Sequence, residues 1–519
     1  MLKHPVTTAF GASTIVLLTL LEPLASPLHT EFYHLTGSVS ALLVPVLLNF
    51  AGVWLVLSLL LVWGSKHPRF NTWVWSCLGI ALSWMVLKDW CALRGGDPVP
   101  GIANLAFAVV VCMIVVAAAA WRSRVQPILH HAKQLAIPIL GFVALSGIVI
   151  LAQAMLFSWQ ARHLNAPRPL HQRTGSTSSS HHHGRIIWIL FDELSYRQVY
   201  EHRYPGLELP AFTQLARTST VFTHTVPSGL YTEQVLPSLI AGQRYDGVRV
   251  SVAGWPLEVH DRSTETWGTL DPHKTVFQDA LDAGYTTAVA GWYNPYCRIL
   301  PEVLDRCFSI SHIALPGGMY PDQSIGWNSE QPIINHFVNL ARLVHLLPRQ
   351  NAPSAELRLH QQDYQEIVAA GDELLRDPSV DFILLHMPIP HPGGIYNRHT
   401  GSFEVSRPSY LDNLALCDVY LAHVRHELEE NGSWNDSTLV IMGDHSWRVS
   451  LFWAKAAGWT EEERIASDNV RFDDRPAYIV KLPSQTTPAR IDEPFDSIRT
   501  RELFDKLFTG QITTPEQLK

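Results

Sequence analysis

Hydrophobic residues crowd the first 160 positions of the chain, where polar residues divide them into five long runs. The runs cover residues 9–27, 38–63, 71–87, 100–121 and 134–158. Each run is close to the ~20 residues that a helix needs to cross ~30 Å of hydrocarbon. The pattern therefore predicts a transmembrane anchor of five helices over residues 1–160.

The first run is also compatible with a signal peptide, because Lys3 precedes its apolar stretch. Glu22 and Pro23, however, interrupt the place where a cleavage site of small residues is expected. Four further runs follow it along the chain. We therefore expect the first run to remain as an uncleaved membrane span.

Lysine and arginine set the predicted orientation, because they are enriched in cytoplasmic segments. With a cytoplasmic N-terminus, the inside segments hold six of these residues: Lys3, Lys66, Arg69, Arg122, Arg124 and Lys133. The first two outside loops hold only Lys88 and Arg94. Five crossings then place everything after residue 160 on the periplasmic or extracellular side of the cytoplasmic (inner) membrane.

The pattern changes beyond the anchor. Residues 161–184 are rich in Pro, Ser and His and are typical of a flexible linker. From residue 185 on, continuous apolar runs alternate with helical segments. The runs 186–191, 380–386 and 437–443 predict buried strands, and 274–285 and 409–432 predict helices. The alternation predicts an α/β domain over 185–519 with a doubly wound, mostly parallel sheet, which binds ligands at the carboxyl ends of its strands.

Charge divides at the same boundary. Residues 1–161 contain 12 charged side chains, about 7%, and the remaining residues contain 74, about 21%. The first part has a net charge of +4 and the second of −12, within a total of −8. This distribution excludes a disordered chain and a basic nucleic-acid-binding protein. It fits a membrane anchor that carries an acidic globular domain.

Two acidic pairs follow predicted strands. Asp192 and Glu193 come directly after the strand at 186–191, and Asp444 and His445 come after the strand at 437–443. Two carboxylates and one imidazole suit Zn²⁺ or Mn²⁺ and leave room for a further oxygen ligand. The alternative is that these aspartates only cap the following helices. Together the pairs predict a site for one divalent metal ion (Zn, Mn, Mg or Ca, with Zn or Mn favoured).

Three further side chains can supply chemistry near these strand ends. Thr232 stands at the start of a predicted helix, where a hydroxyl lies among free N–H groups that favour an anionic phosphate or sulfate. An ordinary helix cap is the alternative. His386 ends the predicted strand at 380–386 and His391 follows it, and either imidazole can contact an oxyanion or protonate a leaving group. We treat both histidines as candidate substrate-binding residues, and Thr232 and His391 as candidate catalytic residues.

The cysteines agree with an outside location. Cys297 and Cys307 are ten positions apart in a polar segment of the predicted domain. In an oxidising compartment, a disulfide between them is plausible.

The order of Asp192, Thr232, His391 and Asp444-His445 resembles the sulfatase branch of the alkaline phosphatase superfamily. With five preceding spans, the architecture is similar to lipoteichoic acid synthases and lipid A phosphoethanolamine transferases. The resemblance implies that Asp192, Thr232, Asp444 and His445 bind the metal. It also implies that Thr232 is the nucleophile and His391 a phosphate or leaving-group contact.

The sequence departs from true sulfatases at three points. Val235 and Leu239 stand where those enzymes have the residue modified to formylglycine and an arginine. Ser446 replaces the glycine that commonly follows Asp-His. Glu193 occupies a position where many sulfatases have a second metal carboxylate. In an enzyme with one metal it is either a ligand or a neighbour of the ligands.

The interpretation is a membrane-anchored, metal-dependent enzyme. We expect it to transfer a phosphoethanolamine- or phosphoglycerol-type group from a lipid-linked donor, through Thr232, to an envelope glycan or lipid. One alternative is a hydrolase of sulfuric or phosphoric esters, and another is an inactive envelope-binding protein. The sequence leaves open the donor, the acceptor, the choice of metal and the oligomeric state.

Overall fold

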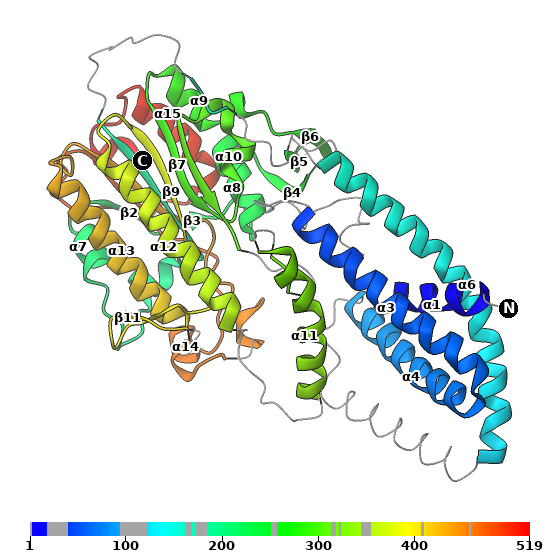
Figure 1. Cartoon of the computed structure of the whole chain (residues 1–519). Coiled ribbons are helices and arrows are strands. Elements are labelled where there is room, and N and C mark those ends of the chain that lie inside the picture. The colour runs from blue at the N-terminus through cyan, green and yellow to red at the C-terminus, as the bar shows by residue number, and fades with distance from the viewer. Residues whose placement is uncertain are drawn as a thin grey trace. The chain divides into compact units, whose positions relative to one another are not determined.

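The computed structural model describes residues 3–17, 40–93, 122–161, 169–172, 184–250, 257–312, 318–320, 323–343, 354–405, 409–455 and 458–519. They belong to two compact units (Figure 1). The anchor unit comprises Met1–Glu31, Gly37–His163 and Ala314–Arg349. The catalytic unit comprises Phe32–Thr36, Leu164–Ile313 and Gln350–Lys519.

The described part of the anchor unit is helical. Its helices are α1 (Lys3–Val16), α3 (Ser40–Lys66), α4 (Pro68–Leu93), α6 (Arg122–Ala161) and α11 (Ile325–Leu343). Helix α1 packs against α3, where the Trp54 indole N–H donates to the Val6 carbonyl at 3.1 Å. Helix α11 comes much later in the sequence and also packs against α3. The Asn49 side-chain amide on α3 donates to the Ser329 carbonyl on α11 at 3.1 Å. A segment from the middle of the predicted catalytic domain thus joins the anchor.

Two helices of the described chain are long and apolar enough to cross a membrane: Leu42–Lys66 and His130–Leu156. Only 22% and 17% of their most apolar windows are buried, whereas the core helix of a soluble protein would be mostly covered. Phe142 and Leu59 are among the large apolar side chains that they expose. Such helices match the predicted runs at 38–63 and 134–158.

The other three predicted spans are not shown as spanning helices. Helix α1 is described over 14 residues, about 21 Å at ~1.5 Å per residue, which is shorter than the hydrocarbon core. Helix α4 covers the run at 71–87, but its side chains are described only up to residue 83. The run at 100–121 lies outside the described residues. The described chain therefore shows two helices of spanning length and composition rather than five.

The catalytic unit is built on an eight-stranded sheet with the order β14-β2-β13-β12-β1-β9-β7-β8. The strands are β1 (Ile186–Asp192), β2 (Thr220–Phe222), β7 (Thr287–Trp292), β8 (Arg306–Ile310), β9 (Phe382–Pro390), β12 (Thr438–Gly443), β13 (Tyr478–Lys481) and β14 (Ala489–Ile491). Strands β12, β1, β9, β7 and β8 are parallel, and β13 is antiparallel to both its neighbours. The predicted α/β class is confirmed, with a mixed, mostly parallel sheet.

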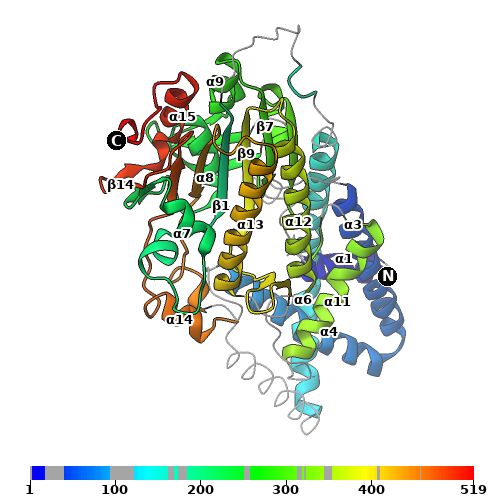
Figure 2. The same cartoon turned by 90° about the vertical axis from the view of Figure 1, so that its left-hand side faces the viewer.

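Helices cover both faces of this sheet (Figures 1 and 2). One layer contains α7 (Pro210–Ala216), α12 (Ser354–Arg376) and α13 (Tyr410–Glu430), and the other α8 (Thr232–Ala241), α9 (Val276–Asp282) and α15 (Thr500–Phe508). Alternate residues of β1 serve the two layers. Phe191 contacts Tyr420 of α13 at 6.1 Å between ring centroids, and Trp188 contacts Phe504 of α15 at 5.0 Å. Burial on both faces explains why β1 is apolar at every position before Asp192.

Smaller elements surround this framework. They are the sheet of β4 (Tyr245–Val250), β5 (Leu257–Asp261) and β6 (Thr266–Thr269), the pair of β10 (Tyr396–Asn397) and β11 (Ser402–Phe403), the pair of β3 (Thr225–Val226) and β15 (Phe495–Asp496), and the helices α10 (Tyr296–Ile299) and α14 (Glu461–Ala466). The sequence pattern did not predict α12 or the β4–β6 sheet.

Cys297 at α10 and Cys307 at β8 form a disulfide. It closes a ten-residue segment beside the sheet, so the Cys297→Ser/Cys307→Ser variant should lose about 2–3 kcal/mol of stability. Thermal unfolding with and without dithiothreitol measures this loss. Reductant should lower the melting temperature of the wild type and of a Cys77→Ser control but leave the double variant unchanged. An equal response of all three proteins would contradict the prediction.

Candidate active site

The ends of the central parallel strands bring the two predicted acidic pairs together. The register of β1 and β12 sets Phe191 opposite Gly443, so the residue after each lies at the same edge of the sheet. The backbone N–H of Asp444 donates to the Phe191 carbonyl at 3.1 Å and continues the ladder by one step. As a result Asp192 and Asp444 are neighbours although 252 positions separate them in the sequence.

The carboxylate of Asp444 is held in one orientation. Its Oδ1 accepts the backbone N–H groups of Glu193 at 2.9 Å and His445 at 2.7 Å. Its Oδ2 accepts the hydroxyl of Thr232 at 2.7 Å and lies 3.2 Å from the Nε2 atom of His445. One oxygen is therefore fixed by the backbone, and the other faces the groups that carry the chemistry.

Thr232 is the first residue of α8, and Tyr231 precedes it as the N-cap without a capping side chain. The Thr232 hydroxyl does not cap the helix; it turns to Asp444 and lies 3.4 Å from Nε2 of His445. The side chain is 4% exposed. The N-terminus of α8 adds a partial positive charge at this point, which favours an anionic group beside the hydroxyl.

Asp192, Asp444 and His445 form a buried group whose ligand atoms all lie within 4.8 Å of one another. Asp192 Oδ1 lies 3.7 Å from His445 Nε2 and has no hydrogen-bond partner in the described structure. Burial raises the pKa of Asp192 well above its usual range, and the charges of Asp444 and Glu193 raise it further. Burial has the opposite effect on the pKa of His445 and lowers it, because it disfavours the charged imidazolium. The imidazole is therefore neutral and available as a ligand. Two facing carboxylates, one unpartnered oxygen and a neutral imidazole fit a divalent cation.

Glu193 has a different role from its neighbour. It lies in the left-handed backbone region, with φ 69°, and its carboxylate is fully buried. It accepts hydrogen bonds from the Arg448 Nε at 2.7 Å, from Arg448 Nη2, and from the Trp453 indole N–H at 2.9 Å. With both oxygens engaged by protein donors, Glu193 is placed as a partner of Arg448 rather than as a ligand.

Arg448 brings a fixed positive charge to the site. Its Nη1 donates to the Leu230 carbonyl at 3.0 Å, two residues before Thr232. Burial alone would lower its pKa, but the charges of Glu193 and Asp192 more than offset this, so the guanidinium stays protonated. The sequence reasoning missed this residue. Its spacing of three positions after His445 is the only local signal.

The two predicted histidines lie on and after β9, the other neighbour of β1. His386 is fully buried; its Nδ1 is 2.8 Å from the Tyr296 hydroxyl, and its Nε2 has no hydrogen-bond partner among the described residues. Burial lowers the pKa of His386 to about 4, with the charge of Asp444 acting in the opposite direction. This interaction places His386 near the acidic group.

His391 follows the end of β9, where Pro390 pairs with Asp192. Its ring lies 5.0 Å from that of Trp453 and 6.0 Å from that of Trp292 between centroids. Burial lowers its pKa well below the usual range, and the charge of Arg448 lowers it further. The structure thus places His391 beside the Arg448 side of the site, as a neutral imidazole.

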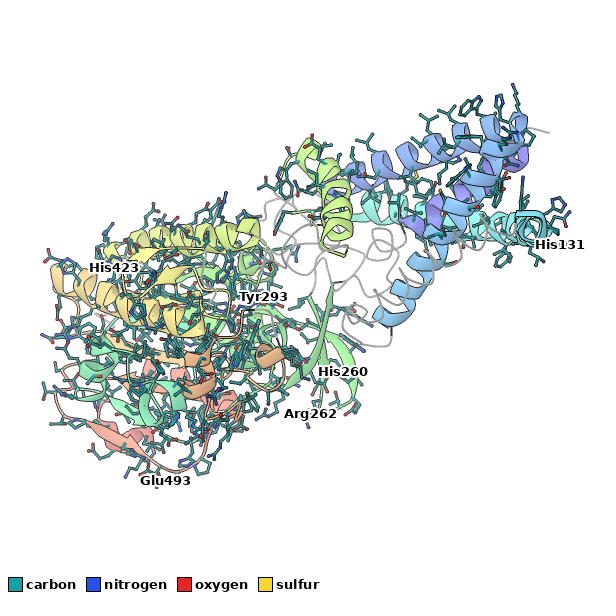
Figure 3. All side chains as sticks on the ribbon, turned by 90° about the horizontal axis from the view of Figure 1, so that it is seen from below. His131, His260, Arg262, Tyr293, His423 and Glu493 are labelled. Carbon is teal, nitrogen blue, oxygen red and sulfur yellow. A yellow bond between two sulfur atoms is a disulfide. The ribbon has the colours of Figure 1, made fainter. Side chains whose placement is uncertain are left out.

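Several other residues of the site carry no signal in the sequence pattern. The Tyr293 hydroxyl, on a residue labelled in Figure 3, donates a hydrogen bond to the Glu233 carboxylate at 3.0 Å. Glu233 is the residue directly after Thr232. The His360 ring on α12 lies 6.2 Å from His391, and its buried Nε2 has no hydrogen-bond partner in the described chain. These side chains come from separate elements, so only the folded chain shows that they are neighbours.

A second group of potential ligands, Asp372, His423 and Glu427, lies on helices α12 and α13 (His423 is labelled in Figure 3). Arg376 already lies between its carboxylates and donates to Glu427 at 2.6 Å and to Asp372 at 3.4 Å. The guanidinium pairs with both carboxylates, and we interpret the group as a surface ion-pair network.

Comparison with known proteins assigns the chain to a family. The family described as Sulfatase matches residues 185–465, just over half of the chain. The chain therefore belongs to the sulfatase family, within the alkaline phosphatase superfamily, and is an enzyme that acts on sulfate or phosphate esters. The match confirms the predicted family and does not distinguish the membrane-anchored transferases within it.

Solved structures with similar folds share little sequence with the chain. Ps i-CgsB, in complex with k-i-k-neocarrahexaose, is 16% identical over 65% of this chain and 74% of its own, with a TM-score of 0.41. The phosphonate monoester hydrolase of Agrobacterium radiobacter is 13% identical over 62% and 73%, with a TM-score of 0.39. Murine ectonucleotide pyrophosphatase/phosphodiesterase 5 is 11% identical over 64% and 96%, with a TM-score of 0.33. No curated protein sequence matches.

Proposed function

We propose that this sulfatase-family enzyme is a membrane-anchored transferase that moves a phosphoryl-linked head group to an envelope acceptor through Thr232. One observation carries the proposal: the Thr232 hydroxyl lies 2.7 Å from Asp444 within the buried acidic group. The positions where sulfatases place their modified nucleophile and its arginine hold Val235 and Leu239, both fully buried apolar residues. Thr232 is thus the hydroxyl in position to attack.

The first half of the reaction forms a bond between the Thr232 oxygen and phosphorus. The Asp444 carboxylate accepts the hydroxyl hydrogen bond and takes up the proton as the oxygen attacks. The bond from phosphorus to the donor oxygen breaks, and that oxygen takes a proton from water as the lipid alcohol leaves. A phosphodiester on Thr232 results, with the head group attached.

A divalent cation held by Asp192, Asp444, His445 and the Thr232 oxygen would act as a Lewis acid, lowering the pKa of the hydroxyl and neutralising phosphoryl oxygens. The donor set of two carboxylates, one imidazole and one hydroxyl favours Zn²⁺ or Mn²⁺. Glu193 is engaged with Arg448 and is left out of this set.

His391 serves the second half of the reaction. Because burial lowers the pKa of its imidazole, the ring is neutral near pH 7 and can accept a proton. We assign it to the acceptor hydroxyl, whose proton it takes up and passes to water while the acceptor oxygen forms the new bond to phosphorus. The bond to Thr232 breaks, and Asp444 returns its proton to the Thr232 oxygen. His386, the deeper ring, is assigned to holding the phosphoryl group.

Arg448 supplies a fixed positive charge beside the acidic group and is assigned to transition-state stabilisation. Arg448→Met should lower kcat/KM for a phosphodiester about 10²-fold, as for the loss of one preorganised charge donor. The single variant leaves the Glu193 carboxylate buried and unpaired, so it is also expected to be less stable.

The double variant Glu193→Gln/Arg448→Met separates these effects. It removes both charges and should recover most of the melting temperature without recovering kcat/KM. Recovery of activity together with stability would show that the pair only supports the fold.

The location of the enzyme is part of the proposal. The two apolar helices and the distribution of Lys and Arg support an anchor in the cytoplasmic membrane with the catalytic unit outside. The proposal takes the predicted runs at 9–27, 71–87 and 100–121 as further crossings, for a total of five. This placement gives access to lipid-linked donors and to glycan or lipid acceptors of the envelope.

Mass spectrometry of the full chain tests the function directly. Incubation with vesicles of phosphatidylethanolamine or phosphatidylglycerol should add the mass of the corresponding head group to the peptide that contains Thr232. Release of head group that does not depend on added acceptor would favour the hydrolase alternative. Absence of both an adduct and turnover on any ester would favour a binding protein.

A further inference from the structure

Four large apolar side chains are exposed beside the catalytic threonine. Leu230 and Tyr231 directly precede Thr232, and Leu451 and Phe452 follow the loop that carries His445 and Arg448; we call these four residues the apolar rim. They are exposed by 38%, 40%, 43% and 41%. The Tyr231 and Phe452 rings lie 6.1 Å apart, so the two halves of the rim meet.

The rim is built onto the active site. The Arg448 guanidinium lies 5.8 Å from the Tyr231 ring and 5.2 Å from the Phe452 ring, and it also donates to the Leu230 carbonyl at 3.0 Å. The same guanidinium is fixed by Glu193. One buried charge therefore positions both halves of an exposed apolar surface. Loops at such places are usually polar, and contiguous exposed apolar side chains mark contact surfaces.

We propose that the apolar rim inserts into the lipid surface that holds the substrate, where it contacts the glycerol and acyl region of a phospholipid. The inference rests on the proposed transfer from a lipid donor and adds the surface that receives that donor. Aromatic rings, leucines and an arginine together are the composition that proteins place at a membrane interface. The anchor of the same chain, with two exposed apolar helices, supplies the membrane.

This placement brings the Thr232 hydroxyl close to the phosphate of a lipid that remains in the membrane. Tyr231 and Thr232 are adjacent, so their Cα atoms are ~3.8 Å apart. When the Tyr231 ring reaches the glycerol region, the adjacent Thr232 lies near the level of the lipid phosphates. A phospholipid can then present its phosphodiester to Thr232 without leaving the membrane.

The first experiment compares two substrates in full-length protein in mixed micelles. One is a phosphatidylethanolamine with a fluorescent head group, and the other is a water-soluble nitrophenyl phosphodiester. For Leu451→Ser/Phe452→Ser, the ratio of lipid to soluble-ester kcat/KM should fall at least about 10-fold. A matched control is Phe403→Ser/Ile465→Ser, which removes side chains that are equally exposed (40% and 43%) elsewhere on the catalytic unit. An unchanged ratio in the rim variant would overturn the proposal.

The second experiment does not depend on turnover. A photo-reactive phenylalanine analogue at position 452 is irradiated in native membranes that contain radiolabelled phospholipid. A lipid adduct at position 452, and none at a control position 403, supports the proposal. Adducts to a second copy of the chain or to another protein, or no adduct, would overturn it. A protein without activity on the soluble ester would refute the proposed function, and the crosslink would still decide the role of the rim.

Discussion

Thr232→Ala should reduce kcat/KM for a phosphodiester at least about 10³-fold and should abolish any covalent adduct, because it removes the oxygen that forms the bond to phosphorus. The hydroxyl is buried and hydrogen-bonded to Asp444, so no neighbouring side chain replaces it. Steady-state kinetics on the soluble ester and intact-mass measurement after incubation with lipid vesicles give the two readouts.

Two further variants make this result specific. Thr232→Ser keeps a hydroxyl at the first position of α8 and should retain part of the activity and the adduct. Thr275→Ala removes a threonine from the start of another short helix, α9, and should leave kcat/KM within about twofold of the wild type. Undiminished turnover by the Thr232→Ala protein would eliminate Thr232 as the nucleophile.

The sequence predicts the position of the acidic group because of how its strands are buried. A strand that is covered on both faces is mostly apolar, as in residues 186–191 of β1 and 439–443 of β12, so the first polar residue after the apolar run marks its end. Parallel neighbours end at the same edge, and Asp192 and Asp444 therefore meet. No knowledge of the side-chain packing is required for this step.

The environment of Glu193 could not be predicted in the same way. Its position beside Asp192 suggests a second ligand, yet its partner Arg448 lies 255 positions away, on a loop whose path no periodicity reveals. Trp453 completes the contact from a short helical turn. Hydrogen bonds between loops that are distant in the sequence decide whether a carboxylate faces a cation or an arginine. Neither the composition nor the hydrophobic pattern of the sequence predicts these hydrogen bonds.

The hydrophobic pattern of the sequence also could not predict which segments belong to the anchor unit. Helix α11 interrupts the sequence of the catalytic unit but packs against α3. Its apolar positions are consistent with a helix of a soluble domain as well as with one that covers an anchor helix. Only the contact between Asn49 and Ser329 and the packing around it assign α11 to the anchor unit.

Asp192→Asn should lower the affinity for the divalent cation at least about 100-fold and remove activity with it, because the variant replaces a charged ligand oxygen that no protein donor occupies. Metal content after dialysis, measured by mass spectrometry, should fall from the wild-type value to near zero. Asp418→Asn is the matched control: that buried aspartate accepts the backbone N–H groups of Ala211 and Phe212 and should keep the metal content of the wild type.

For the metal-free protein, we expect Asp192→Asn to raise stability rather than to impair the protein. Burial and the charge of Asp444 raise the folded-state pKa of Asp192 above its unfolded value, so the folded protein binds more protons than the unfolded chain between the two values. The stability of the metal-free protein must therefore fall as pH rises through that range, and chelation should lower stability more at pH 8 than at pH 5.

Asp192→Asn removes one of the two repelling charges. At pH 8 and without metal it should melt at a higher temperature than the metal-free wild type, although it gains nothing from added cation. A lower melting temperature under these conditions would show that Asp192 is charged and satisfied by the protein alone, and the assignment of the acidic group to a cation would fail.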